Sequence, residues 1–544
     1  MWAFANETGI NDMVNEPNDT KYDELQVNYK RWGTGSVTYF DFYYSHLRSV
    51  VIPSTVEYLG RGAFAWCENL TSVEFKQGFK DKDLRDYMFY ATALEEAVFP
   101  EGIKNIEKAA FMRCDNLTNV SIPSTVEYIG RRAFAYTSNL ETVTFAKGIN
   151  LKLYYIGEQA NGNLVLVDSG AMFDHSGIKS IEIPASVDLL PQLMFQSCVR
   201  LTTVTFEEDS KLVNIRPYAF MNSGLTAIDL PETLEVIGAQ AFANTQLREI
   251  YLPASLSNGD LSTGNAGGDA NKLGWYAFAD NSKLEKIEFD PNCQLEVLSF
   301  RVFQNCPMLT EVILSNNLRS VNGTLAKSAY DNPETKDVVE GTIWTSNAFV
   351  GCISLVTMTV PSGNPYLKVA GYALYSRVLP TDEFINLDWY SQAEVAGGEV
   401  TVEEGIVNIY EYVFSENRYI TKLNFPASVK LVGIAACREM TSLVEVIFAE
   451  GSQLEEIGNY AFGNITTYPK IVSDTGFEST NYDEPPIKTP FVKIMFTALE
   501  APKLGANIFV WSLENPNFAI YVPQEALQSY QTGFAQFSRY LKTY

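Results

Sequence analysis

The sequence predicts a repeat solenoid of α/β type, in which each coil contributes one short parallel strand and returns through an irregular or short helical segment. Three observations lead to this fold class. A motif recurs along almost the whole chain, each copy contains a strand-like pattern of apolar residues, and glycine and proline stand at fixed places between these patterns. Because no single coil can enclose a core, the coils must stack on their neighbours.

The repeat can be read directly from the sequence. Residues 51–70, VIPSTVEYLGRGAFAWCENL, return almost unchanged as residues 121–140, SIPSTVEYIGRRAFAYTSNL. An Ala-Phe pair or its equivalent marks each copy, mostly at steps of about 22 to 25 residues, and longer steps hold insertions. The repeat aromatic falls at Phe64, Phe89, Phe111, Phe134, Phe173, Phe195, Phe220, Phe242, Phe278, Phe303, Phe349, Phe414, Phe462 and Phe509, with Cys437 in the same register.

Each copy also carries a strand signature, an apolar residue followed at +3 and +5 by two more and often by proline at +6. Leu47, Val50, Ile52 and Pro53 form one example among roughly sixteen. The +3 and +5 residues share one face of an extended strand, and the +2 and +4 residues share the other. The first set is apolar and the second is mixed, so one face of the strand is predicted to cover a core and the other to meet water.

Glycine and proline mark the corners of each coil. Glycine stands four residues before the aromatic in several copies, as in Gly130 before Phe134 and Gly238 before Phe242. Glycine permits the positive φ or the close backbone approach that a sharp corner needs. Proline after the strand removes a ladder donor and helps to end the pairing. Each coil is therefore expected to run from strand to corner to a short turn that buries the Ala-Phe pair.

Composition limits the function of the chain. Of 544 residues, 46% are hydrophobic, which supplies a core, and the net charge of -25 disfavours binding to nucleic acid or to an anionic membrane. The first residues lack the basic and apolar segments of a signal peptide, and no run of about 18 apolar residues would span a bilayer. A signal peptide that has been removed, or a lipid anchor outside this chain, stays open.

The segment from Leu47 to Cys67, LRSVVIPSTVEYLGRGAFAWC, resembles the repeat of the BspA-like leucine-rich repeat family, and the resemblance covers about residues 47–523. It implies a right-handed leucine-rich-repeat superhelix. It also implies a secreted or surface-attached bacterial or protozoan protein with a role in adhesion. Residues 520–544 resemble the closing segment of such proteins, which implies a last strand followed by a capping helix.

The predicted organisation is an N-terminal cap at residues 1–46, a solenoid at residues 47–523 and a C-terminal cap at residues 524–544. The first 46 residues are too aromatic for a tail, so they are expected to cover the first coil. Departures from the repeat predict insertions near residues 147–170, 254–272, 315–345, 364–396 and 466–490.

The residues that usually carry catalysis or metal binding are scarce. Five cysteines stand three residues after the repeat aromatic, at Cys67, Cys114, Cys198, Cys306 and Cys352, which predicts buried thiols rather than ligands or nucleophiles. There is no C-x-x-C pair and no G-x-S-x-G motif, and the two histidines are His46 and His175. We therefore expect no enzyme, no cofactor and no metal site, while calcium dependence stays open.

The remaining candidate site is the outward strand face. Charges and an aromatic residue gather there, and apolar residues begin to emerge further along. The candidate ligand-binding residues are Glu249, Tyr251, Lys286, Glu288 and Ile313. Exposed aromatic and apolar side chains are where a protein partner could anchor, although an ordinary solvated sheet has similar composition.

The preferred function is therefore that of a non-catalytic cell-surface or secreted protein, which adheres to host or microbial proteins through the sheet face. The alternative is a surface glycan-binding protein that supports nutrient capture, which an aligned platform of exposed tyrosines and tryptophans would favour. A hydrolase carried by an insertion is disfavoured by the missing motifs. The identity of the ligand and the oligomeric state are not set by the sequence.

Overall fold

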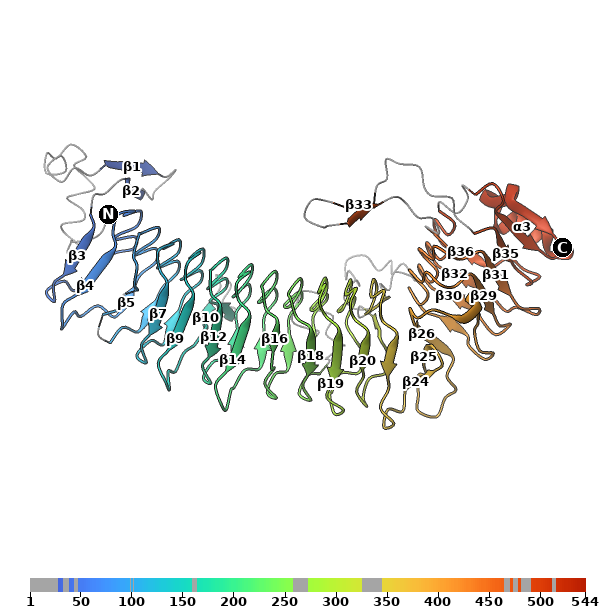
Figure 1. Cartoon of the computed structure of the whole chain (residues 1–544), viewed down its shortest axis with the longest axis horizontal. Helices are drawn as coiled ribbons and strands as arrows, with labels where there is room; N and C mark the ends of the chain where they lie inside the picture. Colours follow the sequence, from blue (N-terminus) through green and yellow to red (C-terminus); the bar gives the residue numbers. More distant parts are fainter. Residues whose placement is uncertain are drawn as a thin grey trace. The chain divides into compact units, whose positions relative to one another are not determined.

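The computed structural model describes residues 28–32, 39–43, 47–97, 99–100, 102–158, 164–257, 273–324, 345–463, 470–472, 478–480, 491–510 and 515–544. The chain divides into two compact units. The first comprises residues 1–255 and 272–281, and the second comprises residues 256–271 and 282–544. In each unit, successive coils stack so that their strands lie side by side (Figure 1).

The first unit carries one main strand per coil, and neighbouring main strands pair in parallel without a shift of register. Ser49 lies opposite Ser72, Asn119 opposite Thr142, and Ser180 opposite Thr203. The main strands are β3 (Ser49–Ile52), β4 (Ser72–Phe75), β7 (Asn119–Ile122), β9 (Thr142–Phe145), β12 (Ser180–Ile183), β14 (Thr203–Phe206), β16 (Ala227–Ile228) and β18 (Glu249–Leu252).

A second row of two-residue strands follows the main row in the first unit. Its parallel members are β5 (Asp83–Leu84), β6 (Asn105–Ile106), β8 (Tyr128–Ile129), β13 (Leu189–Leu190), β15 (Asn214–Ile215) and β17 (Val236–Ile237). Two antiparallel pairs lie outside these rows, β1 (Asn28–Trp32) with β2 (Tyr39–Tyr43), and β10 (Tyr154–Glu158) with β11 (Leu164–Asp168). The sequence pattern indicates the main row alone, because two residues are too short to show a period.

The second unit has the same two rows, interrupted by a hairpin-like insertion. The main row comprises β19 (Lys286–Phe289), β20 (Glu311–Ile313) and β23 (Thr357–Thr359), and then β27 (Glu399–Thr401), β29 (Lys422–Phe425), β31 (Glu445–Phe448), β35 (Lys493–Met495), β37 (Ala519–Val522) and β38 (Leu541–Thr543). The second row is β28 (Asn408–Ile409), β30 (Leu431–Val432), β32 (Glu456–Ile457) and β36 (Lys503–Leu504).

Within the predicted insertion at residues 364–396, β24 (Leu367–Ala370), β25 (Ala373–Ser376) and β26 (Asn386–Tyr390) pair in antiparallel order. β26 then pairs in parallel with β28 and so joins the insertion to the second row. Two further antiparallel pairs are β21 (Asn322–Thr324) with β22 (Thr345–Asn347), and β33 (Lys470–Val472) with β34 (Glu478–Thr480). Residues 1–27, 33–38 and 44–46 of the predicted N-terminal cap lie outside the described residues, as does much of the insertions near residues 254–272, 315–345 and 466–490.

Phenylalanine rings at the repeat position stack into a continuous spine through the first unit. Neighbouring ring centroids along the series Phe64, Phe89, Phe111, Phe134, Phe173, Phe195, Phe220, Phe242 and Phe278 are 5.5, 5.2, 5.3, 5.7, 5.6, 5.3, 5.0 and 5.0 Å apart. All of these rings are buried. The distances are those of offset-stacked aromatic pairs, so each ring packs on the coil before it and the coil after it.

Backbone hydrogen bonds fix the same register beside the rings. The Phe134 N–H donates to the Met172 carbonyl at 3.0 Å, and the Phe195 N–H donates to the Ala219 carbonyl at 2.7 Å. The residues two before and two after the aromatic adopt positive φ, as Arg132 (58°) and Tyr136 (59°) do around Phe134. The side chains of Arg132 and Tyr136 are partly exposed, and the corresponding positions of successive coils form two columns along the turn edge.

The recurrent glycine is required by close contact between coils. A Cβ atom at Gly238 would lie 2.4 Å from the Pro217 nitrogen, and one at Gly130 would lie 2.7 Å from the Lys108 nitrogen. Neither distance can be relieved by turning a side chain, because the obstacle is backbone. Of the two reasons that the sequence offers for this glycine, close approach is the one that applies at these corners.

The second unit keeps the spine in part. Phe303 stacks on Phe349 at 5.4 Å, while the buried Cys437 occupies the aromatic position of its coil. A second stack forms from strand residues, with Phe448 5.1 Å from Phe425 and 5.2 Å from Phe496. The core beneath the main row is therefore continuous where the repeat aromatic is missing.

The chain closes with a short helical segment and a last strand. It consists of η4 (Gln524–Ala526), α3 (Leu527–Gly533) and η5 (Ala535–Tyr540), after which β38 pairs in parallel with β37. Tyr530, Phe534 and Phe537 are buried, and Phe534 packs on Phe496 at 5.4 Å. This segment covers apolar side chains of the second unit that would otherwise meet water.

We expect that Phe195→Ala destabilises the protein by about 3 to 5 kcal/mol, because it removes a fully buried ring and opens a cavity between two coils. Val199→Ala is the matched control on the same coil, since Val199 is 71% exposed, and it should change stability by less than about 0.5 kcal/mol. Denaturant unfolding followed by intrinsic fluorescence measures both. Equal losses of stability in the two variants would show that the stacked phenylalanine rings do not stabilise the protein.

Candidate functional site

The structure places the predicted site residues on the outward face of three main strands. Glu249 and Tyr251 lie on β18 in the first unit, where both are exposed and alternate with the buried Ile250 and Leu252. This alternation is the one that the strand signature predicts. Tyr251 is 41% exposed, so part of this aromatic residue meets solvent.

The other three predicted residues lie together in the second unit. Lys286 and Glu288 stand on β19, with Nζ and Oε2 2.8 Å apart, and Glu288 lies opposite Ile313 of β20. Lys286 also approaches Glu311 at 4.0 Å. All four side chains are half-buried. The structure thus brings Lys286, Glu288 and Ile313 together, while Glu249 and Tyr251 belong to the other unit.

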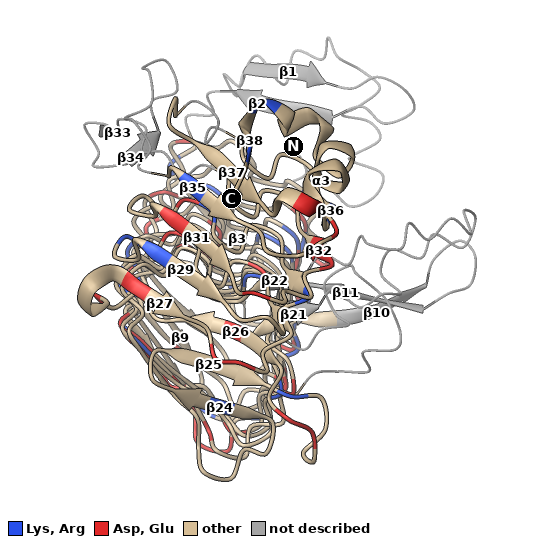
Figure 2. Cartoon of the chain, turned by 90° about the vertical axis from the view of Figure 1, so that its right-hand side faces the viewer, with Lys and Arg blue, Asp and Glu red and all other residues tan. Residues whose placement is uncertain are grey.

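A longer feature on the same face of the second unit is a ladder of alternating charge, formed by Glu399, Lys422, Glu445 and Lys493 on β27, β29, β31 and β35. Its successive ion pairs measure 3.1, 3.8 and 2.5 Å. Figure 2 shows the alternation of red and blue along these four strands. We call this set the charge ladder. Each coil adds one charge opposite in sign to its neighbour, so the side chains hold one another in place.

The charge ladder ends beside an aromatic residue. The ammonium groups of Lys493 and Lys542 lie 5.6 and 5.8 Å from the centre of the Tyr521 ring. The strand signature puts every residue at its +2 position on the outward face, which includes Lys422, Glu445 and Lys493, but sequence reasoning did not use the alternation of sign from coil to coil. That alternation is the signal that could have located the ladder.

On the same face of the first unit, hydroxyl and amide side chains pair between the neighbouring strands β7 and β9. Thr142 donates to the Asn119 side chain, and Ser121 and Thr144 lie 3.1 Å apart on neighbouring strands. These pairs link the exposed positions of β7 and β9 in the way the ion pairs link those of the second unit. At these positions, neighbouring coils are linked by hydroxyl and amide groups in the first unit and by ion pairs in the second.

Aromatic and basic side chains line the turn edge of the first unit. Tyr136 lies between the Arg113 guanidinium, 5.8 Å from its ring centre, and the His175 ring, 4.8 Å away and nearly parallel. Trp66 meets Tyr90 edge-on at 5.0 Å. The ring faces of Tyr136 thus contact side chains of neighbouring coils. This row of aromatic residues is therefore not the open stacking platform that the glycan-binding alternative requires.

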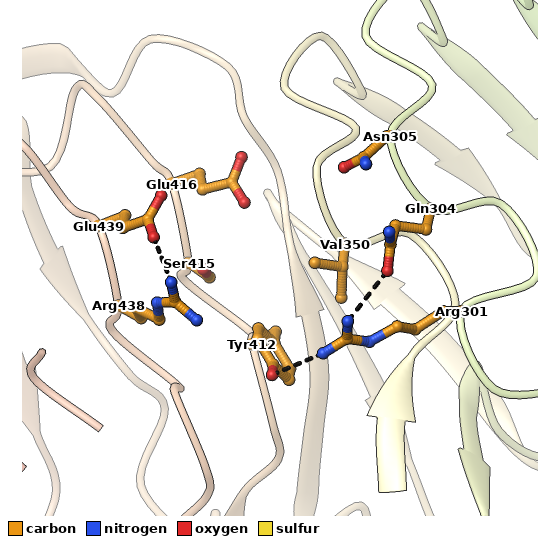
Figure 3. Close-up of a pocket in the computed structure, with 9 residues that line it drawn as sticks. All are labelled: Arg301, Gln304, Asn305, Val350, Tyr412, Ser415, Glu416, Arg438 and Glu439. Atoms are coloured by element: carbon orange, nitrogen blue, oxygen red, sulfur yellow. Dashed lines mark hydrogen bonds and ion pairs between the residues drawn. The ribbon is translucent and has the colours of Figure 1, made fainter. Parts of the chain in front are cut away.

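A polar cavity of about 150 Å³ opens at the turn edge of the second unit (Figure 3). Its walls come from coils that are far apart in sequence, because the insertion at β24 to β26 lies between them. Arg301 and Arg438 reach toward the same space from opposite sides (Figure 3). The polar side chains that line it include Arg301, Gln304, Tyr412, Glu416, Arg438 and Glu439.

The positive-φ columns build this cavity. Arg301 and Tyr412 stand two residues before a repeat aromatic, and Glu416 stands two residues after one, with φ of 51°, 58° and 63°. The Arg301 guanidinium donates to the Tyr412 hydroxyl at 2.8 Å and to Gln304 Oε1 at 3.1 Å. Sequence reasoning missed the site because residues 301 and 412 are separated by the insertion, although polar residues at these two repeat positions were a usable signal.

A buried polar network around Asp388 of β26 connects the insertion to residues of the β21–β22 pair and to Ser320 just before it. Asp388 Oδ1 accepts from Asn322 Nδ2 at 3.0 Å and from Ser320 Oγ at 3.3 Å, and the Asp388 carbonyl accepts from Asn347 Nδ2 at 3.0 Å. Burial raises the pKa of Asp388 to about 7, against the hydrogen bonds that lower it. This carboxyl group therefore gains or loses its proton near neutral pH.

The cysteines have the environment that the repeat predicts. All seven are buried, and the Cys114 thiol donates to the Phe89 carbonyl of the preceding coil at 2.9 Å. Burial raises the pKa of Cys114 and of Cys198 to about 12. The thiolate form needed by a nucleophile or a metal ligand is thus strongly disfavoured at these positions.

The family model for the BspA type leucine rich repeat region matches residues 36–164, 159–260, 260–332 and 390–482 in 6 copies. The chain belongs to the BspA-type leucine-rich repeat family. The predicted family and the predicted class of stacked parallel-strand coils are both confirmed.

Solved structures similar to this BspA-type chain come from several bacteria. A leucine-rich repeat protein from Bacteroides ovatus shares 17% identity, with 79% of this chain and 97% of that one covered and a TM-score of 0.43. A leucine rich cell surface protein from Faecalibacterium prausnitzii shares 14% identity, with coverage of 89% and 94% and a TM-score of 0.35. The pneumococcal vaccine antigen PcpA shares 14% identity, with 95% of each chain covered and a TM-score of 0.27. No curated protein matches the chain.

We expect the free energy of unfolding to depend on pH, because Asp388 has different pKa values in the folded and unfolded chain. The folded pKa of about 7 lies above the value of about 4 in an unfolded chain, so the native state binds this proton more tightly. The resulting stabilisation is complete below about pH 4 and is lost as pH rises to about 7. Three pKa units correspond to about 4 kcal/mol.

Asp388→Asn removes this titration, so the stability of wild type relative to the variant should fall by several kcal/mol between about pH 4 and 7. Urea midpoints measured at intervals of one pH unit test this. Glu383→Gln is the control, because Glu383 is exposed on the same insertion, and its difference from wild type should not follow that profile. A constant difference between wild type and Asp388→Asn would contradict the assignment.

Proposed function

We propose that this chain is a non-catalytic cell-surface or secreted protein that adheres to proteins of a host or microbial surface through its exposed strand face. The observation that carries the proposal is the charge ladder, because it presents ordered side chains at regular spacing over several coils. Lys422 and Lys493 are about one-third exposed, and Glu445 is 22% exposed. Such side chains are already partly ordered, so docking costs less conformational entropy.

Charge alternation favours a partner whose surface has a matching alternation, and it disfavours partners of uniform charge. The Tyr521 ring beside the ladder, Tyr251 on β18 and Ile313 beside Glu288 are proposed as apolar anchors, since aromatic and apolar anchors dominate binding energy at protein interfaces. The net charge of -25 disfavours nucleic acid as the partner. Membership in the BspA-type family supports a binding role, and the similar Faecalibacterium prausnitzii structure is that of a leucine rich cell surface protein, which fits the proposed location.

No helix among the described residues is long and apolar enough to cross a membrane. The proposed location, the extracellular space or the outer cell surface, rests instead on membership in the BspA-type family. A catalytic function has no support in the buried, high-pKa thiols described above.

The glycan-binding alternative is favoured by a different observation, the polar cavity at the turn edge of the second unit. Planar polar side chains that converge with a tyrosine are suited to the hydroxyl groups of sugars. This function would support nutrient capture. It does not require the strand face.

The test of the adhesion proposal uses the full-length chain with immobilised extracellular-matrix proteins and mucins, each intact and enzymatically deglycosylated. We expect binding that survives deglycosylation and weakens with rising ionic strength. Lys422→Glu places a third negative charge between Glu399 and Glu445, so it should reduce binding at least about tenfold.

Lys430→Glu is the matched control for this experiment. It also reverses a lysine of an ion pair, with Glu455 at 2.7 Å, but Lys430 adjoins the second row of strands rather than the charge ladder. Binding of Lys430→Glu should equal that of wild type. The proposal fails if the chain binds none of these surfaces, or if both reversals weaken binding equally.

A further inference from the structure

The polar cavity at the turn edge of the second unit has chemistry that the strand face lacks. Its four charged side chains are two arginines and two glutamates, so the lining carries no net charge. Arg438 Nη2 lies 2.7 Å from Glu439 Oε1, on the same turn. Arg301 is shared between Gln304 and the Tyr412 hydroxyl. The guanidinium groups are therefore compensated or hydrogen-bonded within the wall.

This arrangement discriminates between classes of small ligand. A phosphate or a carboxylate would meet the carboxylates of Glu416 and Glu439 together with the arginines, so much of the attraction would cancel. A zwitterion needs a positive and a negative end, whereas the pairing of Arg438 with Glu439 places opposite charges side by side. A neutral molecule that both donates and accepts hydrogen bonds suits the cavity better than either.

The side chains available to such a molecule are of complementary kinds. Guanidinium groups donate in a fixed plane, carboxylates accept, and the amide of Gln304 does both. Glu439 contacts one terminal nitrogen of the Arg438 guanidinium, Nη2 at 2.7 Å, and a guanidinium carries five N–H donors. Adjacent hydroxyl groups on a sugar ring can accept from a guanidinium and donate to a carboxylate at the same time.

The size of the cavity sets the length of ligand that it encloses. Pockets that enclose drug-sized ligands have volumes of about 300 to 1,000 Å³, and this one has a volume of about 150 Å³. It can therefore enclose one ring, while the rest of a longer ligand would lie outside. The guanidinium of Arg301 lies 5.3 Å from the centre of the Tyr412 ring. This contact holds the Tyr412 ring in place at the base of the site.

We infer that this cavity binds one neutral sugar residue, as the end of a surface glycan. The inference rests on the glycan-binding alternative proposed above and gives that function its site. Arg438 and Glu416 bind the hydroxyl groups, Gln304 positions Arg301, and Tyr412 forms the base. For a single ring, the dissociation constant is expected on the order of 1 mM.

The experiment is ligand-observed saturation-transfer NMR on the full-length chain. The probes are the neutral sugars glucose, galactose, mannose and N-acetylglucosamine, with methyl phosphate and glycine as the anionic and zwitterionic probes, all of which carry carbon-bound protons that the experiment detects. We expect at least one sugar to bind, with methyl phosphate and glycine giving no signal and no competition. Arg438→Gln and Gln304→Ala should each weaken sugar binding at least about tenfold, because each removes or displaces a charged donor.

Arg418→Gln is the control, since Arg418 is exposed on the same coil as Tyr412 and does not line the cavity, and it should bind sugar as wild type does. Matching unfolding temperatures show whether the variants are folded. If no sugar binds, if methyl phosphate or glycine binds instead, or if both folded cavity variants bind sugar normally, the inference is wrong.

The outcome can be separated from that of the adhesion proposal. Lys422→Glu should leave sugar binding unchanged, because the charge ladder is not part of the cavity wall. Arg438→Gln should leave binding to deglycosylated proteins unchanged for the same reason. If the wild-type chain binds a sugar but none of the surface proteins, the adhesion proposal alone is rejected. If the wild-type chain binds the deglycosylated proteins but no sugar, this inference alone is rejected.

Discussion

Stacking of each coil on its neighbour is the interaction on which the rest of the structure depends. In the first unit, the ring of every repeat phenylalanine lies 5.0 to 5.7 Å from the next. Amide hydrogen bonds such as that from Phe195 to Ala219 run beside the rings and set the same register. Gly238 lets the backbones approach as closely as this register demands. No coil could keep its shape alone, since its apolar face would remain exposed.

The fixed register also determines the surface chemistry. Because main strands pair without a shift, a residue type that recurs at one repeat position becomes a straight column on the outward face. Hydroxyl groups form such columns on β7 and β9, and alternating charges form the ladder from β27 to β35. The positive-φ positions beside the repeat aromatic form further columns at the turn edge. Where the insertion interrupts these columns, Arg301 and Arg438 enclose a cavity instead of continuing a row.

The sequence allows prediction of features that repeat and hides features that occur once. The repeat aromatics, the buried cysteines and the alternation on β18 follow from spacing alone, because burial recurs with the period. The second row of strands is too short to have a period. Burial of Asp388 could not be read from the chain, since the residue lies in an insertion and its partner Asn322 is 66 residues away. The hydrogen bond between Arg301 and Tyr412, which are 111 residues apart, could not be predicted for the same reason. The predicted site residues lie on the outward strands, but their role stays a proposal.

Residue-resolved amide hydrogen exchange tests the stacked-coil account most directly. The amides of Phe134, Phe173, Phe195 and Phe220 are each bonded to the following coil and buried beneath the turns. They should exchange most slowly in the first unit and at similar rates, because each opens only when its neighbouring coils separate. Amides of exposed turns, such as those of Lys147 and Gly148, should exchange far faster. If the phenylalanine amides exchanged as fast as these turn amides, the spine would not hold the coils together and the account would be wrong.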